Sequence, residues 1–279
     1  MCLFVCLAAT VINKTSTDGD RVLGVTSVDD ELFVLLRRNV DQVAVYSVSD
    51  YRLQRRLSVL GLRPCGLDNM TSCVHHKCLY MSDFNNSCIH RYDLRSSAVI
   101  KWPVCGSPIG LSVTPSGNLL VACRGKPSKL VELSADSGQR VREITLQSDI
   151  RNLRHSVKLT TDPTHQYVVC HGEWIDSLHR VCLVGGDGNV TRSYGGQRGS
   201  DVGQLRSPRH LAVDKDSQSI FVADCQNDRV VLLSPTLEFV CYVTEELSDP
   251  YRLYLDQVDQ PTRRLFVGQY DGDVVVIQL

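Results

Sequence analysis

The sequence predicts an all-β fold, a six-bladed β-propeller made of four-stranded antiparallel blades. A strand-like motif recurs six times along the 279 residues, and successive copies lie 40 to 54 residues apart, which is the spacing of propeller repeats. Short runs rich in β-branched and aromatic residues flank each copy, and turn-forming Gly, Pro, Asp, Asn and Ser residues separate them. No long segment shows the periodicity of an amphipathic helix.

The repeated motif is interpreted as the second strand of each blade. Its copies are "ELFVLLR" (31–37), "CLYMSDF" (78–84), "NLLVACR" (118–124), "QYVVCHG" (166–172), "SIFVADC" (219–225) and "RLFVGQY" (264–270). One alternating run precedes each copy, another follows it, and a fourth closes most units. We therefore expect a single domain with blades at about 24–59, 60–104, 105–147, 148–196, 197–244 and 245–279 plus 4–11.

The N-terminal segment is predicted to close the ring. The last unit stops at Leu279 after its third strand, and the apolar run 4–11 offers the missing fourth strand, which would remove an open sheet edge. A signal peptide is the alternative for this segment, although no basic residue precedes it and no A-x-A cleavage site follows. Four N-x-S/T sequons favour secretion weakly, at Asn13, Asn69, Asn85 and Asn189.

Composition narrows the class of partner and the compartment. The net charge is −1, so the chain as a whole is not built to bind polyanions, and we expect no DNA partner. No apolar run approaches the roughly 20 residues of a membrane-spanning helix, so no membrane partner is expected. The twelve cysteines form no CxxC pair or Cys/His grid, and those in apolar runs, such as Cys123, Cys170 and Cys241, suit buried reduced thiols. The favoured location is cytoplasmic, with secretion as the alternative.

One predicted blade, at 197–244, carries a recognisable motif. It contains "GSDVGQLRSPRHLAVD" (199–214), then "IFVAD" (220–224), and then Asn227, Arg229 and Val230. This blade resembles an NHL repeat, and fragments of the pattern recur around Asp83 in the second blade and Pro108 in the third. The resemblance implies a propeller like the one at the C-terminus of tripartite-motif ubiquitin ligases, which binds protein partners or RNA. Nothing resembles a RING, a B-box or a coiled coil, so ligase activity does not follow.

The acidic residues of this blade are interpreted as scaffold. A calcium loop beginning at Asp214 would need Gly at its sixth place and Glu at its twelfth, where Ser219 and Cys225 stand. Carboxylates at such positions ordinarily cap turns and pair with nearby donors. We therefore expect structural turn roles for Asp83, Asp214, Asp224, Asn227 and Arg229, with no metal and no cofactor.

No nucleophile elbow, HExxH pair or Walker loop is present, so no catalytic residue is predicted. Binding is favoured because a propeller presents loops on a rigid ring. The candidate binding residues, on loops of one face, are Arg37, Arg38, Arg124, Lys126, His171, Trp174, Arg206, Arg209, His210 and Arg252. They suit a scaffold for protein partners, because Arg and Trp anchor interfaces and acidic residues in the same loops dilute the positive field. The alternatives are an RNA-binding propeller that acts in post-transcriptional regulation or recognises substrates for a ubiquitin ligase, and a secreted lactonase or lyase.

Overall fold

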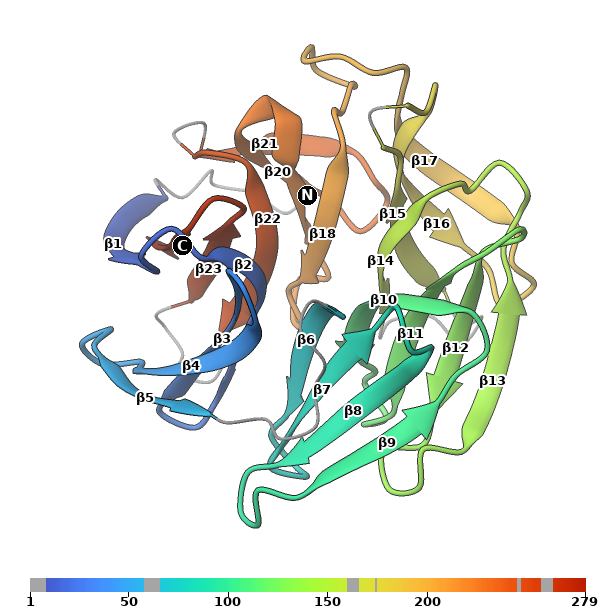
Figure 1. The fold of residues 1–279 in the computed structure, drawn as a ribbon. Helices are drawn as coiled ribbons and strands as arrows, with labels where there is room; N and C mark the ends of the chain where they lie inside the picture. The colour runs from blue at the N-terminus through green and yellow to red at the C-terminus, as the bar shows by residue number, and fades with distance from the viewer. Residues whose placement is uncertain (1–8, 58–65, 160–165, 174, 245–246, 257–262) are drawn as a thin grey trace.

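The fold is a ring of six four-stranded antiparallel sheets, as the sequence predicts (Figure 1). The computed structural model describes residues 9–57, 66–159, 166–173, 175–244, 247–256 and 263–279. Blade 1 comprises β2 (Arg21–Val28), β3 (Glu31–Arg37), β4 (Asp41–Ser47) and β5 (Leu53–Leu57). Blade 2 comprises β6 (Leu67–Cys73), β7 (Cys78–Asp83), β8 (Cys88–Asp93) and β9 (Val99–Pro103). Blade 3 comprises β10 (Ser107–Val113), β11 (Leu119–Arg124), β12 (Lys129–Leu133) and β13 (Arg140–Thr145).

The other three blades repeat the pattern. Blade 4 comprises β14 (Leu153–Lys158), β15 (Tyr167–His171), β16 (His179–Val184) and β17 (Val190–Gly196). Blade 5 comprises β18 (Pro208–Val213), β19 (Ile220–Asp224), the 3-10 helix η1 (Cys225–Asn227), β20 (Arg229–Leu233) and β21 (Phe239–Thr244). Blade 6 comprises β22 (Pro250–Asp256), β23 (Arg264–Gln269), β24 (Asp273–Gln278) and β1 (Thr10–Ser16). Within the described residues, no helix is long and apolar enough to span a bilayer.

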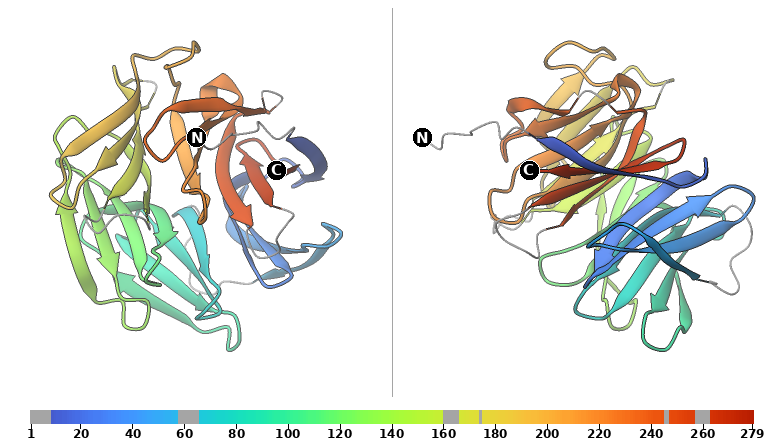
Figure 2. Two further views of the ribbon diagram at one scale, coloured as in Figure 1. Left: turned by 180° about the vertical axis from the view of Figure 1, so that it is seen from behind. Right: turned by 90° about the vertical axis from the view of Figure 1, so that its left-hand side faces the viewer.

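The N-terminal strand closes the ring, as predicted, and its described residues overlap the predicted run at Thr10 and Val11. Strand β1 pairs with β24 from Thr10↔Gln278 to Ser16↔Asp273, and Figure 2 shows these two strands, dark blue and dark red, lying side by side. The strand is 10–16 rather than 4–11, and residues 1–8 lie outside the described part of the chain. An outermost strand has a solvent-exposed side, so β-branched and polar residues suffice there. Apolar content alone therefore does not mark the position of such a strand.

Burial is greatest in the second strands and least in outermost strands such as β5. The second strands are buried on both faces, as in β3, where five consecutive residues from Leu32 to Leu36 are inaccessible. This burial explains why the repeated motif is continuously apolar rather than alternating. Six hydrophobic clusters fill the six interfaces between neighbouring blades, for example Leu35 and Met81 between blades 1 and 2.

The antiparallel order gives the ring two distinct faces. We call one the loop face: it carries the loops between second and third strands (38–40, 84–87, 125–128, 172–178, 225–228, 270–272) and the segments that lead into each first strand. The opposite face carries the remaining turns. Asp41 shows how the loop face is joined, because its carboxylate on blade 1 accepts hydrogen bonds from the backbone N–H groups of Gly66 (3.0 Å) and Leu67 (2.9 Å) at the start of blade 2.

Candidate functional site

Each innermost strand carries a β-bulge at its loop-face end. The register shifts at the equivalent point in all six blades, as between Pro208 and His210 in β18. A bulge leaves one residue out of the ladder and re-aims its side chain. The six residues left out of the pairing are Leu23, Asp68, Ile109, Arg154, Arg209 and Tyr251. The bulges thus place charged side chains from separate blades at one end of the channel.

Four arginines meet at this end of the channel, and we call them the arginine mouth: Arg124, Arg154, Arg209 and Arg252. Glu173, in the loop after β15, forms ion pairs with both Arg124 and Arg154, and its carboxylate lies 4.0 Å from the Arg209 guanidinium. Burial, and then repulsion by Arg209 and Arg124, lower the pKa of Arg154 to about 9. The arrangement is therefore strongly cationic and only partly neutralised.

Arg252 joins blade 6 to blades 1 and 2 through hydrogen bonds and is not a surface binding residue. Its guanidinium donates hydrogen bonds to the carbonyls of Leu23 (2.7 Å), Asp68 (2.6 Å) and Tyr251 (3.0 Å), and it stacks on the Tyr251 ring with 4.1 Å to the centroid. The side chain is buried. The expectation of a loop-face position for Arg252 is therefore wrong, because the bulge before it turns the guanidinium along the inside of the ring.

Two histidines stack below the arginine mouth. The rings of His155 and His210 lie 3.7 Å apart between centroids, on the adjacent strands β14 and β18. Burial lowers the pKa of His155 to about 3 and holds the pKa of His210 well below its usual value, so both are neutral at pH 7. His210 was expected on the loop face, but it is buried in the channel, above a cavity of about 160 Å³ that Met70 and Tyr254 also line.

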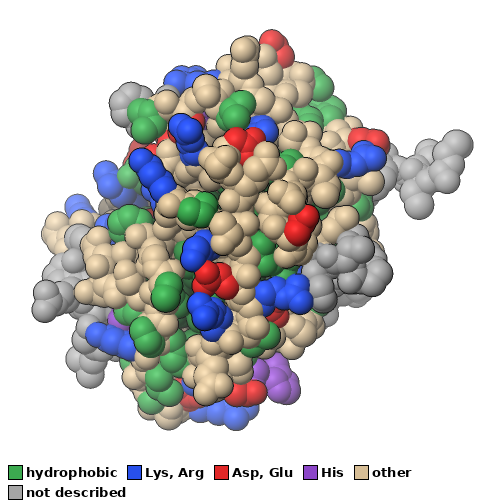
Figure 3. Space-filling model, turned by 90° about the vertical axis from the view of Figure 1, so that its right-hand side faces the viewer, with side chains coloured by type: hydrophobic (Ala, Val, Ile, Leu, Met, Phe, Trp, Pro, Cys, Tyr) green, Lys and Arg blue, Asp and Glu red, His purple; other side chains and the backbone are tan. Residues whose placement is uncertain are grey.

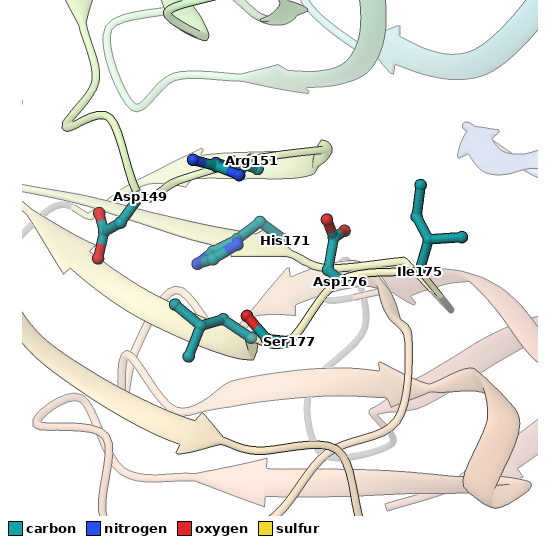
Figure 4. A pocket seen from close by; sticks show the side chains of 7 residues that line it. Asp149, Arg151, His171, Ile175, Asp176 and Ser177 are labelled. Carbon is teal, nitrogen blue, oxygen red and sulfur yellow. The ribbon is translucent and has the colours of Figure 1, made fainter.

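A second, larger hollow of about 370 Å³ opens on the loop face of blade 4. Figure 4 shows Asp149 and Arg151 on one loop and His171, Asp176 and Ser177 on the facing segment. Arg180 donates to His171 Nε2 at 3.3 Å, and burial, followed by Arg180, lowers the pKa of His171 to about 4. His171 was expected on the binding face, and the structure places it in the wall of this pocket as a buried neutral base.

The other predicted binding residues fall into two groups: some form ion pairs or hydrogen bonds within the protein, and others are exposed. Arg37 pairs with Asp41 (2.6 Å) and bonds the Leu67 carbonyl, which ties blade 1 to blade 2. Arg124 belongs to the arginine mouth, where its guanidinium also donates to the Leu153 carbonyl at 3.1 Å. Three of the predicted binding residues are exposed on the loop face, namely Arg38, Lys126 and Arg206. Trp174 lies outside the described residues.

The acidic residues of blade 5 hold turns. Asp224 is fully buried, and its carboxylate accepts hydrogen bonds from Arg206 N (2.6 Å), Asn227 Nδ2 (2.8 Å) and Arg229 Nε (2.9 Å). Arg229 also donates to the carbonyls of Ser200 (2.8 Å) and Gln204 (3.1 Å). This network ties the long segment 197–207 to the hairpin after β19.

The remaining turn carboxylates cap their own turns, and Asp214 also forms an ion pair with Arg263 of blade 6. Asp214 accepts hydrogen bonds from the backbone N–H groups of Asp216 and Ser217, both at 2.9 Å. In blade 2, Asp83 accepts hydrogen bonds from the side chain of Asn86 and from the His90 ring. These contacts support turn roles for both carboxylates.

Three buried side chains of blade 2 could approach a metal ion. One ligand atom each from Asp83, Cys88 and His90 lies within 4.8 Å of the others, a grouping that the sequence analysis did not find. Asp83 Oδ2 already accepts from His90 Nε2 at 2.9 Å, and both its oxygens accept from Asn86. His90 Nδ1 has no partner to orient the ring, whereas metal-bound histidines almost always have one. These contacts favour a hydrogen-bonded turn.

Exposed apolar side chains gather on the loop face, which sequence reasoning missed. Nine large hydrophobic side chains are exposed in the described part of the chain, and five of these lie in loops or turns. Four of the five are on the loop face: Val40, Phe84, Ile175 and Val202. The fifth, Val74, is on the opposite face. Three of the four are in the loops after second strands, so the repeat alignment would have found them.

Comparison with known proteins supports the fold alone. No protein-family model matches the sequence, and a search of the curated proteins finds no relative. Among solved structures, hydrazine synthase of Kuenenia stuttgartiensis is similar, with a TM-score of 0.66 and 14% sequence identity over 95% of this chain and 97% of that chain. The similarity agrees with a six-bladed propeller fold for this chain.

Proposed function

We propose that this chain is a non-catalytic interaction module that binds protein partners through the loop face. The observation that carries the proposal is the position of exposed apolar side chains in loops, four of five on that face, beside the exposed cations Arg38, Lys126 and Arg206. Apolar anchors surrounded by charged groups are typical of protein interfaces. The NHL-like motif of blade 5 supports the same class of function, and a cytoplasmic location remains part of the proposal.

RNA binding through the same face is the second candidate, because arginine and lysine side chains neutralise phosphates. The charge pattern favours a protein partner. Acidic and basic side chains are interspersed on the side of the ring that Figure 3 draws, and the net charge of the chain is −1. Salt dependence separates the two candidates, since RNA affinity falls steeply as salt rises while an apolar protein interface changes little.

The test compares two sets of four exposed hydrophobic residues, each replaced by serine. The loop-face set is Val40, Phe84, Ile175 and Val202, which are residues 53, 39, 68 and 63% exposed. The matched control set is Leu53, Val74, Ile100 and Val141, which are residues 45 to 57% exposed on outer strands or the opposite face. Each protein is used to capture partners from cell extract, followed by quantitative mass spectrometry.

We expect partners recovered with the wild type and the control set to be lost with the loop-face set. Equal recovery with both sets would contradict the proposal. Nucleic acid recovered only at low salt would instead support RNA binding. Arg209 and Arg252 are unsuitable for charge reversal in this test, because both lie inside the mouth of the channel.

A further inference from the structure

In the part of the chain that the structure describes, the arginine mouth contains more positive charge than the nearby carboxylates neutralise. Four guanidinium groups share the carboxylates of Glu173 and Asp68. The carboxylate of Asp176 also attracts Arg124 electrostatically. This carboxylate already accepts hydrogen bonds from the Asn152 side chain and the Glu173 backbone N–H. Even with all three carboxylates counted, one positive charge remains in excess.

Two of the arginines also keep unused hydrogen-bond donors. The Nε atoms of Arg154 and Arg209 are buried without a hydrogen-bond partner. A buried donor that is not hydrogen-bonded costs free energy, which an acceptor bound at this point would recover. The side chains are 12% and 16% exposed, so the mouth is not sealed from solvent.

The residues around the arginine mouth hold its guanidinium groups in position. Arg209 lies over the Tyr251 ring, 5.5 Å from its centroid, which holds the guanidinium away from solvent. The blades also meet closely here, since a Cβ on Gly110 would lie 2.6 Å from the Arg154 carbonyl oxygen. Planar guanidinium groups held in this way match the two oxygens of a carboxylate or phosphate.

We propose that the arginine mouth binds an oxyanion, a carboxylate or a phosphate, presented by an acidic segment of a protein partner. This inference rests on the proposed function for the source of the oxyanion, but the site itself can be tested with small anions. The apolar residues around the loop face would then provide contact area, while the mouth selects acidic partners.

The test measures binding of inorganic phosphate by calorimetry and by thermal stabilisation, at constant ionic strength set with NaCl. We expect Arg209→Gln to weaken phosphate binding at least tenfold, since it removes one charged partner. Arg95→Gln, at an exposed arginine on the opposite face, is the control and should bind like the wild type. Glu173→Gln should bind more tightly, because it removes the carboxylate that competes for three of the arginines.

The two variants are expected to change phosphate affinity in opposite directions, so the test stays decisive even if one variant folds poorly. Absence of phosphate binding by the wild type, or equal binding by wild type and Arg209→Gln, would overturn the inference. Two peptides that differ only in carrying glutamate or phosphoserine at one position are then compared. The peptide that binds more tightly shows whether the oxyanion is a carboxylate or a phosphate. Partner capture that depends on Val40, Phe84, Ile175 and Val202, without any phosphate binding, would leave the proposed function standing and remove only the oxyanion site.

Discussion

Replacing Arg229 by methionine tests how the loop face is held in place. Arg229 and Asp224 form an ion pair at 2.9 Å, with side chains only 6% and 0% exposed. Methionine keeps much of the aliphatic volume but leaves the Asp224 carboxylate buried without its cation. It also removes the hydrogen bonds to the carbonyls of Ser200 and Gln204. Breaking a buried pair by removing one partner costs about 3–5 kcal/mol.

The expected result is a large fall in thermal stability together with loosening of one loop. A loss of about 3 kcal/mol lowers the Tm of a protein of this size by roughly 6–12 °C, measured by circular dichroism. The segment 197–207, which carries the exposed Val202, should become sensitive to protease before the rest of the ring unfolds. Arg55→Met provides the control, because Arg55 and Glu31 form an exposed pair whose loss costs at most about 1 kcal/mol.

A double replacement separates the ion pair from general packing. Asp224→Asn with Arg229→Met should cost less than the sum of the single changes, with a coupling of about 1–3 kcal/mol, since neither partner is then left as an unpaired charge. The assigned role of Arg229 is wrong if its replacement by methionine changes the free energy of unfolding by less than about 1 kcal/mol and leaves the segment 197–207 as resistant to protease as in the wild type.

Three further predictions concern the channel, the ring closure and the grouping in blade 2. His155 and His210 stay neutral in the folded protein, whereas in the unfolded chain these histidines take up protons near pH 6.5. Their contribution to the free energy of unfolding is therefore fully present above that pH. It falls by about 2 kcal/mol per histidine between pH 7 and pH 5. Urea titration of His155→Gln should show a shallower loss, with exposed His75→Gln as control, and equal slopes would contradict the assignment. Deleting residues 1–16 should lower the Tm and promote association through the uncovered edge of β24; melting identical to that of the wild type would argue against closure by β1. Zinc should leave the Tm unchanged, because Asp83 is already occupied by Asn86 and His90; stoichiometric zinc binding that Cys88→Ser abolishes would show a metal site.

The architecture could be predicted because it depends on local periodicity. The buried second strands appear as continuous apolar runs, and their spacing sets the number of blades. The position of the closing strand could not be read in the same way, since an outermost strand such as β1 needs little apolar surface. Seven of the nine described cysteines are buried, although Cys241, expected to be buried, is partly exposed in β21.

The site was harder to predict because it depends on bulges and on long-range contacts. Sequence position assigned Arg209, His210 and Arg252 to the loop face, but a one-residue bulge turns their side chains toward the channel or along its wall. Arg154 was missed altogether, although a signal existed: the dipeptide Arg-His occurs at the same bulge in blades 4 and 5, at 154–155 and 209–210. Glu173, which joins three of the arginines, comes from a loop whose position only the fold reveals.

Site-specific photo-crosslinking tests the central claim, that the loop face binds protein partners. Blade 2 offers a matched pair of positions, Phe84 on the loop face and Val74 on the opposite face, which are residues 39% and 45% exposed. A photoreactive phenylalanine analogue is placed at each position in turn, and crosslinked proteins are identified after irradiation in cells. We expect the Phe84 position to crosslink a defined set of proteins and the Val74 position to give only background. Equal crosslinking at both positions, or specific crosslinking at Val74 alone, would contradict the account.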